Sequence, residues 1–169
     1  YIDSETETID SMNSLIDWLP NNLPTEKRTG IVHGDYSLTN VMIGKNDPNV
    51  IAILDWELST LGDPCADFNY HCLQYTMNPK LADKEYCKNQ GIPVIDDYVK
   101  MYSEKIEIDL TEEWDLYSAY NLFKLAGILQ GILGRVRDGT AAHENAAERA
   151  SGVRNLSDKA WDLVEKNFL

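Results

Sequence analysis

One segment in the second half of the chain constrains the fold more than any other. Residues 112–138 read "EEWDLYSAYNLFKLAGILQGILGRVRD", and the long apolar centre of this segment carries one charged side chain, Lys124. A helix that is apolar around most of its circumference is buried in the middle of a domain. We expect Thr111 to cap this helix and Gly139 to end it, because these residue types favour those positions. The segment therefore predicts a domain built largely from helices.

Other helices are predicted on both sides of a short β region. Ile31 and Val32 form an expected short strand, and residues 40–56 read as a β-hairpin whose turn, "KNDPN", contains residues that favour tight turns. The fold class expected is α+β, weighted to α, with residues 1–169 as a single domain. Apolar periodicity and an Asp-Pro helix start indicate the remaining helices, over about 5–19, 63–75, 95–106 and 142–167.

Composition limits the partners that this chain can have. The 169 residues carry a formal net charge of −13. That charge argues against nucleic acid or an anionic membrane as a partner, because both call for a basic surface. The longest aliphatic run, "VIAIL", is too short to span a bilayer, and no signal peptide is visible. Three cysteines without paired spacing indicate reduced thiols, so we expect an intracellular protein.

A polar loop within "IVHGDYSLTNVMIG", residues 31–44, is the leading candidate for a functional site. Asp35 can accept a proton, and the side-chain carbonyl oxygen of Asn40 is a hard ligand that suits Mg²⁺. Asp55 follows the second strand of the predicted hairpin, and antiparallel pairing would bring it back beside Asn40. The sequence therefore predicts a carboxylate base, a carbonyl ligand and a carboxylate ligand around one or two divalent cations.

This set of groups matches what phosphoryl transfer requires. A phosphoryl-transfer enzyme holds the metal ions of a nucleotide, orients an attacking hydroxyl and accepts its proton. Protein kinases place an aspartate before an asparagine with four residues between them, and a metal-binding aspartate on a nearby strand. The same arrangement is formed here by Asp35, Asn40 and Asp55, with His33 two residues before the first aspartate.

Three motifs, "HGDYSLTN", "ILDWE" and "LGDPCAD", occur in this order within residues 31–70. Together they resemble the aminoglycoside-phosphotransferase and choline-kinase branch of the protein-kinase-like fold. The segment "DWELSTLGDP" is most similar to the kinase-like domain that precedes some large acyl-CoA dehydrogenases. The resemblance is looser through the helices to about residue 140. It implies the C-terminal lobe of a kinase-like fold, with a catalytic loop and metal-binding hairpin over 31–56 and a helical subdomain over 63–169.

The resemblance also implies a role for each residue at a matching position. These are Asp35 as the catalytic base, His33 as the residue that orients the catalytic loop, Asn40 and Asp55 as the ligands of Mg²⁺ and its ATP, Asp67 as a brace of the catalytic loop, and Asp63 as the cap of the following helix. The implied reaction transfers the γ-phosphoryl group of ATP to a hydroxyl of a small molecule. The similarity to acyl-CoA dehydrogenases makes a hydroxy acid or a hydroxyacyl-CoA the leading acceptor.

The chain departs from the kinase pattern before His33. A complete kinase has an N-terminal lobe with a glycine-rich phosphate loop and a strand lysine. Residues 1–32 contain one glycine, Gly30, and one lysine, Lys27, in an expected loop. We therefore expect the missing N-terminal lobe to be a partner in cis, and we expect this chain alone to be inactive.

Two other interpretations remain open. His33 and Asp35, with His71 or His143, have the residue types of a non-haem iron facial triad, although both later histidines lie in helix-like sequence. The domain could also be a non-catalytic kinase-like module that binds or regulates within a larger protein. Metal-dependent nucleotide binding separates this second interpretation from an enzyme.

Overall fold

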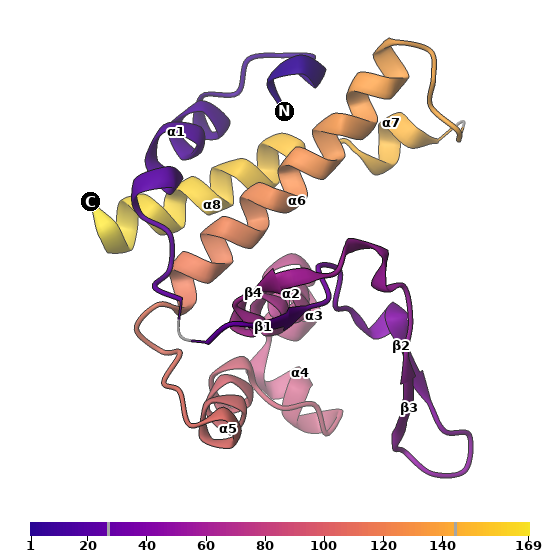
Figure 1. The fold of residues 1–169 in the computed structure, drawn as a ribbon, viewed down its shortest axis with the longest axis vertical. Helices are drawn as coiled ribbons and strands as arrows, with labels where there is room; N and C mark the ends of the chain where they lie inside the picture. The colour runs from indigo at the N-terminus through magenta and orange to yellow at the C-terminus, as the bar shows by residue number, and fades with distance from the viewer. Residues whose placement is uncertain (27, 144) are drawn as a thin grey trace. The chain divides into compact units, whose positions relative to one another are not determined.

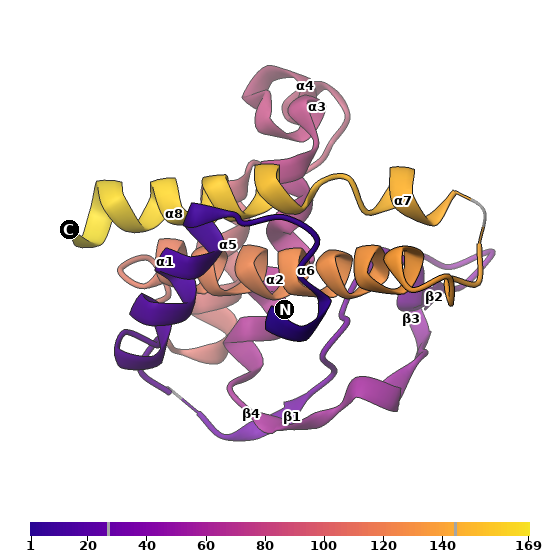
Figure 2. The ribbon, with the colours of Figure 1, turned by 90° about the horizontal axis from the view of Figure 1, so that it is seen from above.

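The computed structural model describes residues 1–26, 28–143 and 145–169. Its chain forms two compact units, which we call the terminal unit (Tyr1–Pro24 and Asp115–Leu169) and the central unit (Thr25–Trp114). Figure 1 and Figure 2 show the elements of both units. Lys27, which the sequence places in a loop, lies outside the described residues. The assignment of the whole chain to a single domain stays a prediction.

The terminal unit is built from helices. α1 packs against α8, and the apolar faces of both helices are buried. The Ser11 hydroxyl of α1 donates to the Asp158 carboxylate of α8 at 2.6 Å. Removal of apolar surface from water is the dominant favourable term in folding, so this packing stabilises the unit. The helices are α1 (Asp10–Trp18), most of α6 (Trp114–Arg137), α7 (Ala146–Arg149) and α8 (Val153–Phe168).

The predicted buried helix is confirmed as α6, with a corrected start. α6 begins at Trp114, and the expectation that Thr111 caps it is wrong, because the Thr111 hydroxyl donates to Asp109 instead, at 2.7 Å. Gly139 ends the helix as predicted, with a φ of +70° and a main-chain N–H that donates to the Val136 carbonyl at 3.1 Å. None of the described helices, α6 included, has the length and apolar character needed to cross a membrane.

The predicted helix over 142–167 is interrupted. α7 ends at Arg149 and α8 begins at Val153, so that a turn separates two helices. The hydroxyl of Ser151 donates to the Glu148 carbonyl at 2.8 Å, which offers the backbone an alternative to continued helix. Gly152 follows, and glycine is a poor helix former. The start predicted for the first helix is also too early, because α1 begins at Asp10.

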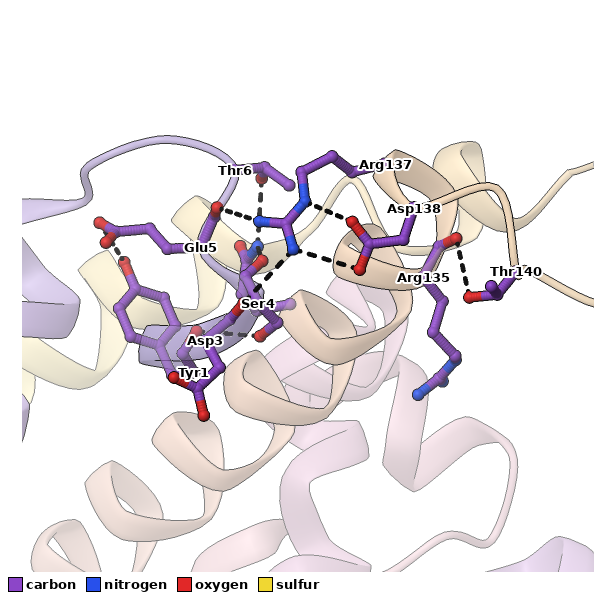
Figure 3. A network of polar contacts seen from close by, with 10 residues as sticks. Tyr1, Asp3, Ser4, Glu5, Thr6, Arg135, Arg137, Asp138 and Thr140 are labelled. Carbon is purple, nitrogen blue, oxygen red and sulfur yellow. Dashed lines mark hydrogen bonds and ion pairs between the residues drawn. The ribbon is translucent and has the colours of Figure 1, made fainter.

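The first residues of the chain are bonded to the C-terminal half of α6 (Figure 3). The side-chain amide of Gln130, which is fully buried, donates to the Ser4 carbonyl at 2.5 Å and to the Thr6 hydroxyl at 3.1 Å. Gly134 lies one turn further along the helix, where an added Cβ would lie 2.7 Å from the Ser4 Cβ. The close approach of the Ser4 backbone therefore requires glycine at this position.

Arg137 completes this attachment of the N-terminal segment. Its guanidinium donates to the main-chain carbonyls of Glu5 at 2.8 Å and Asp3 at 3.3 Å, and forms an ion pair with Asp138 at 2.8 Å (Figure 3). A planar guanidinium can serve several acceptors in one geometry. The segment before α1 is thus held by polar bonds to α6, whereas α1 itself is held by apolar packing.

The central unit contains two short antiparallel strand pairs. β2 (Val41–Ile43) pairs with β3 (Val50–Ile53), which confirms the hairpin predicted over 40–56. β1 (Gly30–Val32) confirms the strand predicted at residues 31 and 32, and it pairs with β4 (Thr60–Gly62), a strand that the sequence did not indicate. These pairs form the two ends of the polar loop between β1 and β2.

Helices complete the central unit, so the α+β fold weighted to α is confirmed. α2 (Pro64–Met77) has the predicted cap, since the Asp63 carboxylate accepts from the Cys65 N–H at 2.9 Å. The ring of Phe68 on α2 stacks on Tyr102 of α5 with centroids 3.8 Å apart, and both helices contribute to the core. The other helices are α3 (Pro79–Ala82), α4 (Lys84–Asn89) and α5 (Ile95–Ile106), the last with the predicted bounds.

Candidate active site

The structure brings together the two ends of the polar loop between β1 and β2. The side-chain amide of Asn40 donates to the main-chain carbonyl of Asp35 at 2.9 Å and to its carboxylate at 3.1 Å. Both side chains are half-buried. Because the amide nitrogen serves Asp35, the amide oxygen of Asn40 is left as an acceptor. The loop therefore presents a carboxylate and a carbonyl oxygen side by side.

His33 links this loop to the end of the hairpin. Its side chain is 2% exposed, and both ring nitrogens have main-chain partners. Nδ1 lies 3.2 Å from the Asp35 N–H, which can only donate, and Nε2 lies 2.7 Å from the Leu54 carbonyl, which can only accept. These partners fix the neutral tautomer with the proton on Nε2. His33 thus contacts the backbone of Asp35 on one side and the backbone of Leu54, the residue before Asp55, on the other.

Asp55 lies directly after β3 in a conformation that is uncommon for residues other than glycine. Its φ is 66° and its ψ is 52°, in the left-handed region, where aspartate is among the residues that are tolerated. The Leu54 N–H donates to the main-chain carbonyl of Asn40 at 2.8 Å, so the chain enters Asp55 alongside the loop. Residues in sparsely populated conformations cluster at functional sites. The exposed carboxylate of Asp55 has no hydrogen bond or ion pair to any residue that the structure describes.

The N-terminal turn of α2 holds the backbone of the loop. The Asp67 carboxylate accepts from the main-chain N–H of His33 and, at 3.0 Å, from that of Gly34. Gly34 has a φ of +85°, and a Cβ there would lie 2.6 Å from the Leu58 carbonyl oxygen. Two bonds from one carboxylate and a glycine-only conformation therefore fix the chain immediately before Asp35. Asp63 acts at the N-terminus of the same helix, as its N-cap.

Tyr70 is a site residue that the sequence reasoning missed. Its phenol lies near enough to the Asp35 carboxylate to be affected by its negative charge. Burial raises the pKa of the Tyr70 phenol to about 12, and the negative charge of Asp35 adds to the rise. The sequence did contain a signal, since Tyr70 follows Asp67 by three residues, and such residues share a helix face.

An aromatic cluster continues from the loop toward α5. The rings of Tyr36 and His71 lie 5.5 Å apart, and the Tyr98 hydroxyl lies 3.3 Å from Nε2 of His71. On the other side, the rings of His33 and Trp56 lie 4.7 Å apart. Aromatic rings therefore pack against Tyr36, next to Asp35 in the chain, and against His33, two residues before it.

The donor set of the loop suits Mg²⁺. Asn40 and Asp55 offer a carbonyl oxygen and a carboxylate, which are hard ligands, and Mg²⁺ is commonly bound by one or two carboxylates together with substrate phosphates. Among residues 1–26, 28–143 and 145–169, no cluster of three or more His, Cys, Asp and Glu side chains could hold a metal by itself. Both nitrogens of His33 already have main-chain partners, which argues against the iron triad considered from the sequence.

Comparison with known proteins identifies the family to which this chain belongs. The model of the phosphotransferase enzyme family matches residues 1–120, and the chain belongs to this family. A crystal structure from Ralstonia eutropha JMP134, of a protein provisionally described as an aminoglycoside phosphotransferase, superposes with a TM-score of 0.89 at 42% identity, over 98% of this chain and 52% of that one. The fold is accordingly the kinase-like lobe that the motifs indicated.

Two relatives are much longer proteins. Acyl-CoA dehydrogenase family member 10 of Mus musculus is 37% identical over 98% of this chain and 16% of its own length. Acyl-CoA dehydrogenase family member 11 of Homo sapiens is 32% identical over 96% of this chain and 21% of its own length. The resemblance to the kinase-like domain of large acyl-CoA dehydrogenases is thereby confirmed. The chain spans about one fifth of these relatives, and about half of the solved structure.

Proposed function

We propose that this chain is the C-terminal lobe of an ATP-dependent phosphotransferase that acts on a hydroxyl of a small molecule. One observation carries the proposal: Asn40 donates to Asp35 in a loop whose backbone is fixed by hydrogen bonds, and the bond from the Leu54 N–H to the Asn40 carbonyl brings the chain alongside this loop immediately before the left-handed Asp55. A carboxylate base and two hard oxygen ligands are the protein groups that phosphoryl transfer uses. Membership of the phosphotransferase family supports this choice among the chemistries open to the site.

In the proposed mechanism, each residue of the loop has a separate task. Asp35 accepts a hydrogen bond from the attacking hydroxyl, orients it and takes its proton. Asn40 and Asp55 would hold the Mg²⁺ of the nucleotide. ATP would supply the γ-phosphoryl group and leave as ADP, and Mg²⁺ would neutralise the negative charge of the phosphates. His33 and Asp67 keep the loop in one conformation, so that the base does not have to be ordered in each turnover.

The proposed enzyme needs a nucleotide-binding lobe that this chain does not provide. No glycine-rich loop with a strand lysine is found in residues 1–32, and the relatives are several times longer than the chain. The phosphates of ATP would then lack the strand lysine that binds them and the glycine-rich loop that covers them. We therefore propose that residues 1–169 alone do not turn over, and that the lobe acts together with another segment of the full-length protein.

We propose a hydroxy acid or a hydroxyacyl-CoA as the acceptor. The names of the longer relatives support this choice, because acyl-CoA dehydrogenases act on acyl-CoA esters. An aminoglycoside or an amino alcohol is the competing acceptor, since the net charge of −13 favours a cationic molecule. The three cysteines are buried and not in disulfides, which supports an intracellular site of action.

The test is transfer of label from [γ-³²P]ATP to 3-hydroxybutyryl-CoA and to kanamycin, measured on the full-length protein and on residues 1–169. The proposal expects Asp35-dependent transfer by the full-length protein to one of these acceptor classes, and none by the isolated chain. Robust transfer by the isolated chain would overturn the claim that it is an incomplete lobe.

A binding assay separates the enzyme from a non-catalytic module. Mg²⁺ and ATP are titrated against the full-length protein and its Asp55→Ala variant. Metal-dependent nucleotide binding that is lost in the variant supports the enzyme. Absence of binding in both proteins supports a kinase-like module that binds another ligand.

A further inference from the structure

We propose that four exposed apolar side chains, Ile31, Leu54, Trp56 and Leu61, form the surface on which the nucleotide-binding lobe of the full-length protein docks. We call this set the apolar strand surface. The inference rests on the proposed phosphotransferase function for the identity of the occupant, and it adds the place where the second lobe meets this one. The occupant is the part of the full-length protein that precedes residue 1, and the face that it presents is apolar.

The first support is the concentration of exposed apolar side chains in one region of the chain. Among the residues that the structure describes, sixteen large apolar side chains are exposed, and ten of these lie within residues 31–61. The four members of the apolar strand surface are 45% to 74% exposed. Single exposed apolar residues are normal, whereas a group of them in one place marks an interaction site.

The β1–β4 pair supplies two of the four side chains. Ile31 and Leu61 are cross-strand partners, so that their side chains lie on the same face of the pair. The residues of the two strands, Gly30–Val32 and Thr60–Gly62, carry no charge. A pair of strands is marginally stable in water unless further structure packs on it. The exposed face of this pair therefore suits an apolar partner.

The other two side chains lie on either side of Asp55, a proposed ligand of Mg²⁺. His33 contacts both residues, because its Nε2 lies 2.7 Å from the Leu54 carbonyl and its ring centroid lies 4.7 Å from that of Trp56. The Trp56 ring N–H donates to the Ile53 carbonyl at 2.8 Å, so the polar group of this side chain already has a partner. A segment that covers Leu54 and Trp56 therefore also meets Asp55.

The size of a relative and the local charge indicate the occupant. The solved relative superposes over 98% of this chain and 52% of its own, so about half of that single chain lies outside the shared lobe. A second copy of this chain is a poor occupant, because a symmetric contact would bring Asp55 and Glu57, the charged residues of the segment 50–62, against the same acids of the other copy. An apolar lobe of the same protein covers the surface without this repulsion.

Cysteine labelling of the full-length protein tests the docking. Leu61→Cys and Ile31→Cys are compared with Met101→Cys, on α5, whose side chain is 51% exposed and outside the apolar strand surface. Maleimide labelling of each cysteine is followed by peptide mass spectrometry, in buffer and in urea. We expect labelling in buffer to be at least about 10-fold slower than in urea at positions 31 and 61, and within about twofold at position 101. Equal ratios at the three positions would overturn the proposal.

Photo-cross-linking identifies the occupant. Photo-leucine replaces part of the leucine of the full-length protein, and peptides cross-linked to Leu54 or Leu61 are identified by mass spectrometry after irradiation. Cross-links to the part of the protein that precedes residue 1 support the proposal. Cross-links only to the part that follows residue 169 or to another copy, or none at all, overturn it.

Neither experiment needs turnover, so failure of the proposed function is recognised separately. If the wild-type protein transfers no label from ATP, but positions 31 and 61 are protected and the expected cross-links form, the docking surface stands and the phosphotransferase proposal is wrong. If the protein transfers label and the two positions are not protected, the docking proposal alone is wrong.

Discussion

The two compact units are stabilised in different ways. In the terminal unit, helices bury complementary apolar faces, as in α1 and α8, where Met12, Leu15 and Val164 are fully buried. In the central unit, the strands around the polar loop leave large apolar residues exposed, with Ile31 at 68% and Leu61 at 74%. The loop itself is held by bonds to its backbone, and its Gly34 has a positive φ.

The stability of the fold and the chemistry of the candidate site therefore depend on different kinds of contact. Buried apolar faces tolerate conservative substitution, because volume and pattern matter more than individual atoms. A loop that is fixed by a few directional hydrogen bonds tolerates substitution poorly, because each bond requires a particular geometry. We therefore expect substitutions in the polar loop to affect activity or local structure strongly, and substitutions on the helices of the terminal unit to affect mainly stability.

The largest effect is expected at the proposed base. Asp35→Asn keeps the size of the side chain and removes its ability to accept a proton, so label transfer by the full-length protein should fall by about 10²- to 10⁴-fold. The urea midpoint should change little, because the residue is only half-buried. Asp17→Asn, an exposed substitution on α1, is the control. Equal label transfer by the two variants would show that Asp35 is not the base.

The second effect concerns the glycine before that base. Gly34→Ala places a Cβ 2.6 Å from the Leu58 carbonyl at a φ of +85°, whereas Gly91→Ala meets no atom within 4 Å at a φ of +68°. The left-handed conformation costs alanine about 1–2 kcal/mol at either site. The clash should add at least about 1 kcal/mol to the loss of unfolding free energy at Gly34. Urea unfolding of both variants measures this difference, and equal losses would show that the loop adjusts freely.

The sequence could predict those parts of the fold that depend on neighbouring residues. The bounds of α5, the hairpin and the cap at Asp63 follow from local rules, since apolar spacing, turn residues and an N-cap act over a few residues. The start of α6 was misjudged because Asp109, in the preceding turn, engages Thr111 in place of the helix. β4 was missed because strands of three residues carry little pattern, and its pairing with β1 spans about thirty residues of chain.

For the candidate site, motif spacing identified residues but could not give their contacts. Asp35, Asn40 and Asp55 were matched to the kinase motifs by their order and spacing along the chain alone. The tautomer of His33 depends on the Leu54 carbonyl, and the position of Tyr70 near Asp35 depends on the way α2 approaches the loop. Both depend on tertiary structure, which a single sequence does not record. The roles of the site residues stay predictions until activity is measured.

The third prediction tests the attachment of the N-terminal segment within the terminal unit. Gly134→Ala would bring a Cβ within 2.7 Å of the Ser4 Cβ, whereas Gly127→Ala, in the same helix, meets no atom within 4 Å. Alanine favours a helix over glycine by about 1 kcal/mol, and overpacking costs about 1–3 kcal/mol. We expect Gly127→Ala to raise the unfolding free energy by about 1 kcal/mol, and Gly134→Ala to lower it by about 1 kcal/mol. Two gains of equal size in urea unfolding would show that the segment in Figure 3 moves aside without cost.

The smallest effect is a pH dependence that belongs to the central unit. Burial lowers the pKa of His71 below its usual 6.5, and its Nδ1 has no hydrogen-bond partner among the described residues. The unfolded chain has the usual pKa, so between the two values it binds more protons than the folded protein does, and the unfolding free energy falls as pH falls below about 6.5. His71→Phe keeps an aromatic ring and removes this titration. The urea midpoint of the variant should therefore fall less than that of the wild type between pH 7.5 and 5.5, and parallel losses in the two proteins would show that His71 is not kept neutral by the fold.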